Sequence, residues 1–143
     1  MDIKHIPAAD FIPHRPPIAF ADFLEGPCMP FVTAYTVPEE SPYVDGGFLI
    51  PEALLEVMAQ CFAAGAGFRE SQAGGSVSWG YLAGVKGFRV HAPVRSGDIL
   101  RAECTVTASV GPIHVVEGEV MRGGEKIASA QIKIFIPEAA END

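Results

Sequence analysis

Glu56 is a carboxylate inside a long apolar segment, FLIPEALLEVMAQCFAAGAGF, which covers residues 48–68. If this segment is helical, Glu52, Glu56 and Gln60 follow one another at i,i+4 steps and form a single polar line. Such a line either faces water or borders an internal cavity. The line is only one residue wide and continues into Ala63, Ala64 and Gly67, which favours the cavity. A carboxylate that lines a cavity is suited to general acid/base chemistry.

The remaining candidate groups form no established motif. The four histidines (His5, His14, His91 and His114) have neither HxxxH nor HExxH spacing, so the sequence predicts no metal. We expect His14, within IPHRPP, to form a local hydrogen bond in an N-terminal arm. GxSxG, P-loop and GxGxxG sequences are also missing, and we predict no cofactor.

Composition limits the class of protein. A chain of 143 residues is typical of one domain, and a net charge of −8 argues against a nucleic-acid partner. No uninterrupted apolar run is long enough to span a bilayer, and residues 1–10 contain no apolar core of a signal peptide. We therefore expect a soluble, cytoplasmic protein without membrane contact.

The pattern along the chain predicts one long helix among strands. The helix begins near residue 51, where Pro51 suits a first turn and Glu52 suits the positive end of the helix dipole, and it ends between residues 68 and 71. Residues 1–16 are expected to be an irregular arm and 138–143 a flexible acidic tail. Apolar or alternating segments bounded by Gly and Pro predict strands at 17–24, 30–37, 77–90, 98–108, 113–121 and 126–136.

This layout indicates a single α+β domain over residues 1–143. An antiparallel sheet wrapped around the one apolar helix would bury the inner face of the sheet and most of the helix. The small residues at 63–67 would let the helix and the sheet approach closely. The fold predicted from this pattern is the hotdog fold.

Three motifs resemble the FabZ/FabA-type 3-hydroxyacyl-[acyl-carrier-protein] dehydratases. IPHRPPIAFADFLEG is similar to the opening of that family, IPEALLEVMAQ to its central helix, and YLAGVKGFRVHAPVRSGDIL to a later strand and turn. GEKIASAQIKIFI resembles its last strand. The resemblance implies a hotdog dimer that acts on acyl thioesters of acyl-carrier protein or coenzyme A. It also implies a His and a carboxylate, from opposite subunits, as the acid and base.

The resemblance places the family carboxylate on Glu56 and its neighbouring Gln on Gln60. The family His does not carry over, because the corresponding position holds Tyr43, and Glu52 replaces the family Gly that helps to bind the thioester carbonyl. SPYVDGGFLIP is similar to the loop of a divergent branch associated with aryl-polyene clusters. Some members of that branch are expected to be partner subunits of a competent dehydratase.

Two groups near the missing His could assist Glu56. Tyr43 could donate a proton, and Asp45 could form a pair of carboxylates with Glu56; alternatively, both simply belong to a turn. We assign Gln60, Gly46, Gly47 and Phe48 as candidate substrate-binding residues. The basic cluster Lys86, Arg89, Arg95 and Arg101 either docks an acidic carrier protein or is an ordinary solvated surface.

The sequence therefore predicts a 3-hydroxyacyl-thioester dehydratase, or a dehydratase-like subunit, of fatty-acid or polyketide-type biosynthesis. One alternative is a non-catalytic acyl-binding subunit that pairs with an active homologue, and this alternative is supported by the missing His. Another is an acyl thioesterase, in which the helix carboxylate would activate water. The expected assembly is a homodimer or a heterodimer with a related dehydratase.

Overall fold

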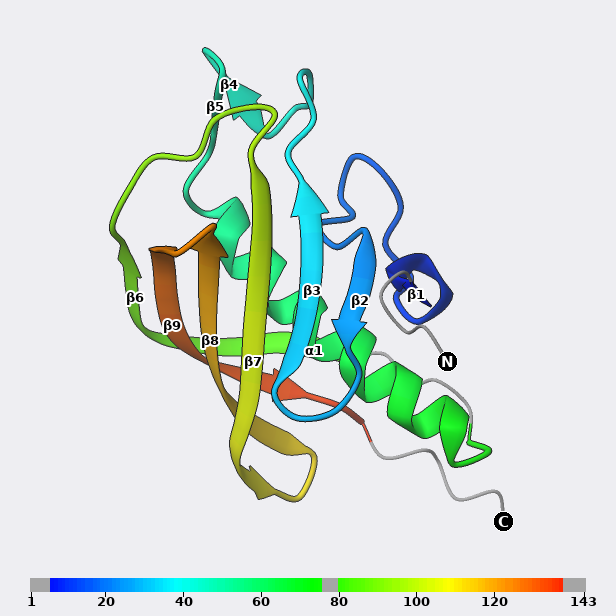
Figure 1. The fold of residues 1–143 in the computed structure, drawn as a ribbon. Coiled ribbons are helices and arrows are strands. Elements are labelled where there is room, and N and C mark those ends of the chain that lie inside the picture. The colour runs from blue at the N-terminus through cyan, green and yellow to red at the C-terminus, as the bar shows by residue number, and fades with distance from the viewer. Residues whose placement is uncertain (1–5, 76–79, 138–143) are drawn as a thin grey trace.

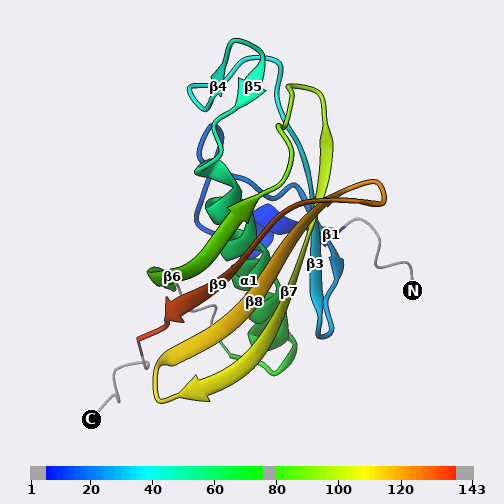
Figure 2. The same ribbon diagram turned by 90° about the vertical axis from the view of Figure 1, so that its left-hand side faces the viewer.

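A computed structural model describes residues 6–75 and 80–137. A seven-stranded antiparallel sheet curves around one helix, α1 (Ala53–Gln72), which lies along its inner face (Figures 1 and 2). The strands follow the spatial order β1 (Ile6–Pro7), β2 (Phe23–Gly26), β3 (Phe31–Thr36), β7 (Ile99–Val110), β8 (Ile113–Arg122), β9 (Glu125–Phe135) and β6 (Tyr81–Val90). A separate hairpin of β4 (Val44–Asp45) and β5 (Phe48–Leu49) lies near the beginning of α1.

Alternation along the central strands directs one side of the sheet towards α1. In β7, Leu100, Ala102 and Cys104 are buried, whereas the intervening Arg101 and Glu103 are exposed. Side chains two residues apart share a face of a strand, so this pattern makes one apolar face. The helix packs on that face against β3, β7 and β8.

Glycine allows the helix and the sheet to come close together at two places. A Cβ atom on Gly65 of α1 would overlap the ring of Phe31 on β3. A Cβ atom on Gly118 of β8 would lie 2.8 Å from the sulfur of Met58 on α1. The prediction that small residues in the helix permit close packing is therefore confirmed at Gly65.

These features confirm the predicted α+β hotdog fold. The predicted strand at 17–24 is wrong over most of its length, because β2 begins only at Phe23. The carbonyl of Ile18 and the N–H of Phe20 bond to the side chain of Gln60 on α1 instead of to a neighbouring strand. A polar side chain on the helix therefore takes the place of strand pairing.

Part of the N-terminal arm is packed and regular. Residues 6–10 form β1 and a short 3₁₀ helix, η1 (Ala8–Asp10), where the sequence predicts an irregular segment. Ala8 and Ile12 are buried in a small apolar cluster with Leu24 and the helix residue Ala64. The predicted tail at 138–143 and the first residues of the predicted strand 77–90 lie outside the described residues. Within the described ranges, no helix is long and apolar enough to cross a membrane.

Candidate active site

Glu56 and Gln60 occupy successive turns of α1 and are joined by a hydrogen bond. The amide nitrogen Nε2 of Gln60 donates to Oε1 of Glu56 at 3.2 Å. Glu56 is partly buried, and Gln60 is only 1% exposed. The polar line on the helix therefore turns inward at these two residues.

Gln60 is fixed by two further hydrogen bonds to the segment that precedes β2. The N–H of Phe20 donates to its Oε1 at 2.6 Å, and its Nε2 donates to the carbonyl of Ile18 at 3.0 Å. Since both ends of the amide have partners, the side chain is held in one orientation. Gln60 thereby attaches the 18–20 segment to α1 and orients the carboxylate of Glu56.

Glu56 lines two cavities. One, of about 300 Å³, runs along the small side chains of α1 towards the end of β9 and is bordered by Tyr81 and Leu82 of β6. The other, of about 400 Å³, lies between the beginning of α1 and the segments before β2 and β4. His14 lines both cavities together with Glu56. The carboxylate therefore reaches space large enough for part of a small-molecule ligand.

Tyr43 lines the second of these cavities, together with Glu56. Its ring packs edge-on against Phe20, with the ring centroids 5.1 Å apart. Its carbonyl accepts a hydrogen bond from the N–H of Ile50, just before the helix. The structure thus brings Tyr43 and Glu56 to one cavity, as their proposed cooperation requires.

Asp45 and the glycines that follow it lie in the β4–β5 hairpin and border neither cavity. Gly46 and Gly47 form its two-residue turn with φ of +61° and +84°, a conformation that favours glycine at both positions. Asp45 is exposed. The ring of Phe48 lies under the guanidinium of Arg95, 5.1 Å from its centroid. These residues therefore have evident structural roles, and their assignment to catalysis or substrate binding stays a prediction.

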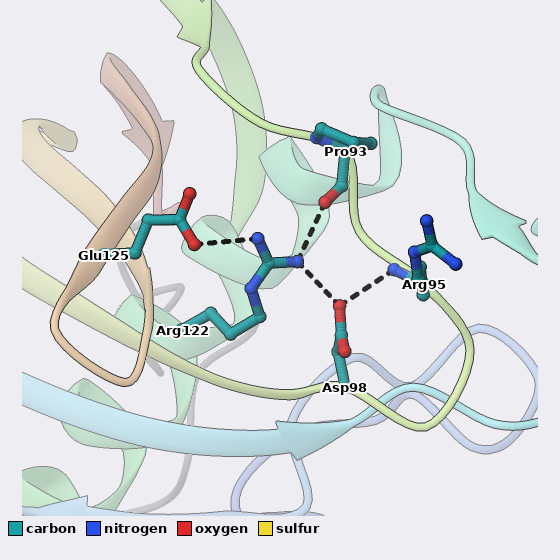
Figure 3. Close-up of polar contacts among 5 residues, drawn as sticks. All are labelled: Pro93, Arg95, Asp98, Arg122 and Glu125. Carbon is teal, nitrogen blue, oxygen red and sulfur yellow. Dashed lines mark hydrogen bonds and ion pairs between the residues drawn. The ribbon is translucent and has the colours of Figure 1, made fainter.

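A polar cluster fastens the turn that carries Arg95. The guanidinium of Arg122 on β8 donates to the carbonyl of Pro93, to Asp98 and to Glu125, each at 2.8 Å (Figure 3). Asp98 also accepts from the N–H of Arg95 at 2.9 Å. The same turn is bonded to the β4–β5 hairpin, because the N–H of Leu49 donates to the carbonyl of Val94. The loop before α1 is therefore attached to the main sheet.

Partial burial is the largest influence on the pKa of Asp98 and raises it, but the other influences together outweigh it. The hydrogen bond from the N–H of Arg95, the hydrogen bond from Arg122 and the positive charges of both side chains hold the pKa below its usual value. Asp98 is therefore an ionised anchor of this turn at neutral pH.

The structure does not bring the four basic residues together. Lys86 and Arg89 are exposed on β6, and Arg95 lies beside the hairpin. Arg101 is on β7, which is separated from β6 by β8 and β9, and its Nε is 2.8 Å from the carboxylate of Glu25. A role of this cluster in carrier docking stays a prediction.

His14 is the cavity residue that sequence reasoning missed. Its sequence position predicts a local hydrogen bond in the arm, but its Nδ1 is buried and has no hydrogen-bond partner among the described residues. The available signal was its place in IPHRPP, within the segment that resembles the dehydratases. Glu52, expected on the same line as Glu56, is exposed at the edge of the second cavity.

A sheet wrapped around one helix, with a helix carboxylate facing a cavity beside the outer strand β6, defines a hotdog-fold protein with a candidate acid/base site. Residues 6–143 match the ApeP-like family, which is described as ApeP dehydratase. The chain belongs to this family.

Two relatives agree with this assignment. The chain is 32% identical over 141 residues to a 3-hydroxyacyl-[acyl-carrier-protein] dehydratase FabZ of Shewanella woodyi, covering 92% of this chain and 90% of that protein. A protein of the same name from Shewanella loihica is also 32% identical, over 150 residues, and covers 99% of this chain and 95% of its own length.

Solved structures show the same fold at lower sequence identity. A chain of the dehydratase heterocomplex ApeI:P from Xenorhabdus doucetiae superposes with a TM-score of 0.86 at 19% identity, over 96% of this chain and 95% of that chain. The PaaI protein of E. coli, from a phenylacetic acid degradation operon, has a TM-score of 0.58 at 16% identity, over 73% of this chain and 74% of that chain.

Proposed function

We propose that the protein removes water from a 3-hydroxyacyl thioester, with Glu56 as an acid/base group. The observation that carries this proposal is the carboxylate of Glu56, which is oriented by Gln60 and borders two cavities. Membership of the ApeP-like dehydratases and 32% identity to two FabZ proteins support the reaction type. A carboxylate that borders a substrate cavity can exchange protons with a bound ligand.

The reaction requires a proton to leave C2 and the hydroxyl group to leave C3. The electron pair of the C2–H bond becomes the C2=C3 double bond, and the C3–O pair departs with oxygen, which takes up a proton to form water. Glu56 borders space for these two carbons, and Gln60 fixes one of its carboxylate oxygens, leaving the other for the substrate.

We further propose that the chain works in a dimer with a related dehydratase. Among the described residues, the sheet ends at β6, whose outer edge pairs with no other strand. Tyr81, Leu82, Val85 and Val90 expose apolar side chains on this strand. The heterocomplex from Xenorhabdus doucetiae, a structural relative, pairs two dehydratase chains. Because Tyr81 and Leu82 also border the Glu56 cavity, a subunit at this edge would lie beside the site.

A non-catalytic role within such a dimer is the second candidate function. The resemblance to the dehydratases expects the catalytic His at the position of Tyr43. In that case the chain would contribute binding or scaffolding, and the partner would contribute the chemistry.

Product analysis distinguishes these functions. The protein alone, a FabZ-type dehydratase alone and their co-purified complex would each be incubated with a 3-hydroxyacyl thioester. Formation of the 2-enoyl thioester that depends on Glu56 supports dehydration by this chain. Activity only in the complex and independent of Glu56 supports the non-catalytic role. Release of free thiol without the enoyl product would show a thioesterase instead.

A further inference from the structure

His14 lies in the N-terminal segment, far from Glu56 in the sequence, yet it borders the same space as Glu56. The two residues are 42 positions apart and both line the 300 Å³ and the 400 Å³ cavities. Two separate cavities are therefore shared by one imidazole and one carboxylate. Asp45, by contrast, borders neither of them.

A hydrogen bond fixes the backbone of His14, whereas the Nδ1 atom of its ring is not used in the packing of this segment. Nη1 of Arg15 donates to the carbonyl of Ile12 at 2.9 Å and to the carbonyl of His14 at 2.7 Å. Ile12 is itself buried, and so anchors this turn in the core. The Nδ1 atom of His14 is buried, and within residues 6–75 and 80–137 it has no hydrogen-bond partner. Buried polar atoms are seldom left unpaired, and such an exception calls for a functional or solvent explanation.

An imidazole is better suited than the neighbouring phenol to exchange protons near neutral pH. Histidine is the side chain whose ordinary titration range lies there, whereas phenols titrate near pH 10. Tyr43 also shares only one of the two cavities with Glu56. The geometry therefore favours His14 over Tyr43 as the group that completes the acid/base pair.

We propose that His14 is a catalytic residue that pairs with Glu56 and supplies the imidazole that the family pattern expects at the position of Tyr43. This inference rests on the proposed dehydratase function. Glu56 accepts the C2 proton, and the C–H electron pair forms the C2=C3 double bond. The C3–O bond breaks with its electron pair on oxygen, which receives a proton from the imidazole of His14 and leaves as water. The proton on Glu56 then returns to His14, so that neither group changes over a complete cycle.

The test compares His14→Ala with wild type in the state that is active, either alone or in complex with the related dehydratase. His91→Ala is the matched control, because His91 is exposed beyond the end of β6 and borders neither cavity. We expect kcat of His14→Ala to fall on the order of 10²–10⁴-fold, as for the loss of one acid/base group, with KM changed only a few-fold. Added imidazole should restore part of kcat, which a purely structural role of His14 would not allow. His91→Ala should retain wild-type kcat.

Folding is checked by circular dichroism and thermal unfolding, and His14→Gln provides a second variant that keeps a polar side chain. The proposal is overturned if either folded His14 variant keeps wild-type kcat, or if His14→Ala loses activity that imidazole does not restore. In both cases, a loss of activity in Glu56→Gln would still support the proposed dehydratase function. If wild type itself forms no enoyl thioester in any state, the proposed function fails, and this inference fails with it.

Discussion

At the scale of single residues, the buried amide of Gln60 connects the helix, the segment before β2 and the carboxylate of Glu56. Its three hydrogen bonds join Phe20, Ile18 and Glu56. The i,i+4 spacing of Glu56 and Gln60 could be predicted from the sequence, because it follows from helix geometry alone. The bonds to residues 18 and 20 could not, since they depend on how a distant segment crosses the helix.

Substitution of Gln60 should affect stability as well as activity. In Gln60→Ala the N–H of Phe20 loses its partner inside the protein, so the free energy of unfolding should fall by about 1–3 kcal/mol. Gln72→Ala, at the exposed end of the same helix, is the matched control and should change it little. Chemical denaturation measures both, and equal stability of Gln60→Ala and wild type would contradict the assigned role.

The position of His14 shows the same limit of sequence reasoning. Its place in the chain suggested an N-terminal arm with a locally bonded histidine. The fold instead packs Ala8 and Ile12 against the core, which brings the following residues over the cavities beside α1. Only long-range packing decides whether a histidine in such a segment meets a carboxylate 42 residues later.

At the scale of elements, the strands with clear alternation were predictable and the segment 17–22 was not. Segments such as β7 alternate between the core and solvent, and that alternation is visible in the sequence. Residues 17–22 are apolar enough for a strand, but the carbonyl of Ile18 and the N–H of Phe20 bond to the side chain of Gln60 on α1. Periodicity describes which faces are buried, and it does not identify the partner of each backbone group.

The turn before β7 should make stability depend on pH. The pKa of Asp98 is lowered in the folded protein, so its contribution is fully present above its unfolded pKa near 3.8 and disappears as pH falls through the lower folded value. At pH 7, Asp98→Asn should reduce the free energy of unfolding by about 1 kcal/mol, since the pair with Arg122 is partly exposed.

Denaturant unfolding at several values between pH 7 and pH 2.5 measures this difference. The curves of wild type and Asp98→Asn should converge at the acid end. Asp45→Asn, in the exposed hairpin turn, is the control and should follow wild type throughout. A difference between wild type and Asp98→Asn that stays constant with pH would argue against the ionised anchor.

At the scale of the whole molecule, the free edge of β6 is the feature that a partner subunit would cover. Tyr81 is 62% exposed and Val85 43% exposed on a ten-residue strand that pairs on one side with β9. Unpaired sheet edges promote association with another strand. The same edge borders the cavity of Glu56, so association and activity should be linked.

A carboxylate placed on this edge should weaken association. We expect Val85→Glu to lower the affinity for a partner subunit on the order of tenfold or more, because the charge would be buried without a counter-ion. Val110→Glu, at the end of β7 and 75% exposed, adds the same charge away from the edge and should leave affinity unchanged. Sedimentation velocity with the related dehydratase measures both variants. Equal affinities would place the interface elsewhere.

The central claim is that Glu56 takes part directly in dehydration. The most direct measurement is kcat for enoyl-thioester formation by wild type and Glu56→Gln. Glu103→Gln is the control, because Glu103 is exposed on β7 and borders neither cavity. Removal of an acid/base group predicts a decrease on the order of 10²–10⁴-fold for Glu56→Gln, with both variants folded and Glu103→Gln close to wild type. A folded Glu56→Gln protein that forms the enoyl thioester at the wild-type rate would contradict the claim.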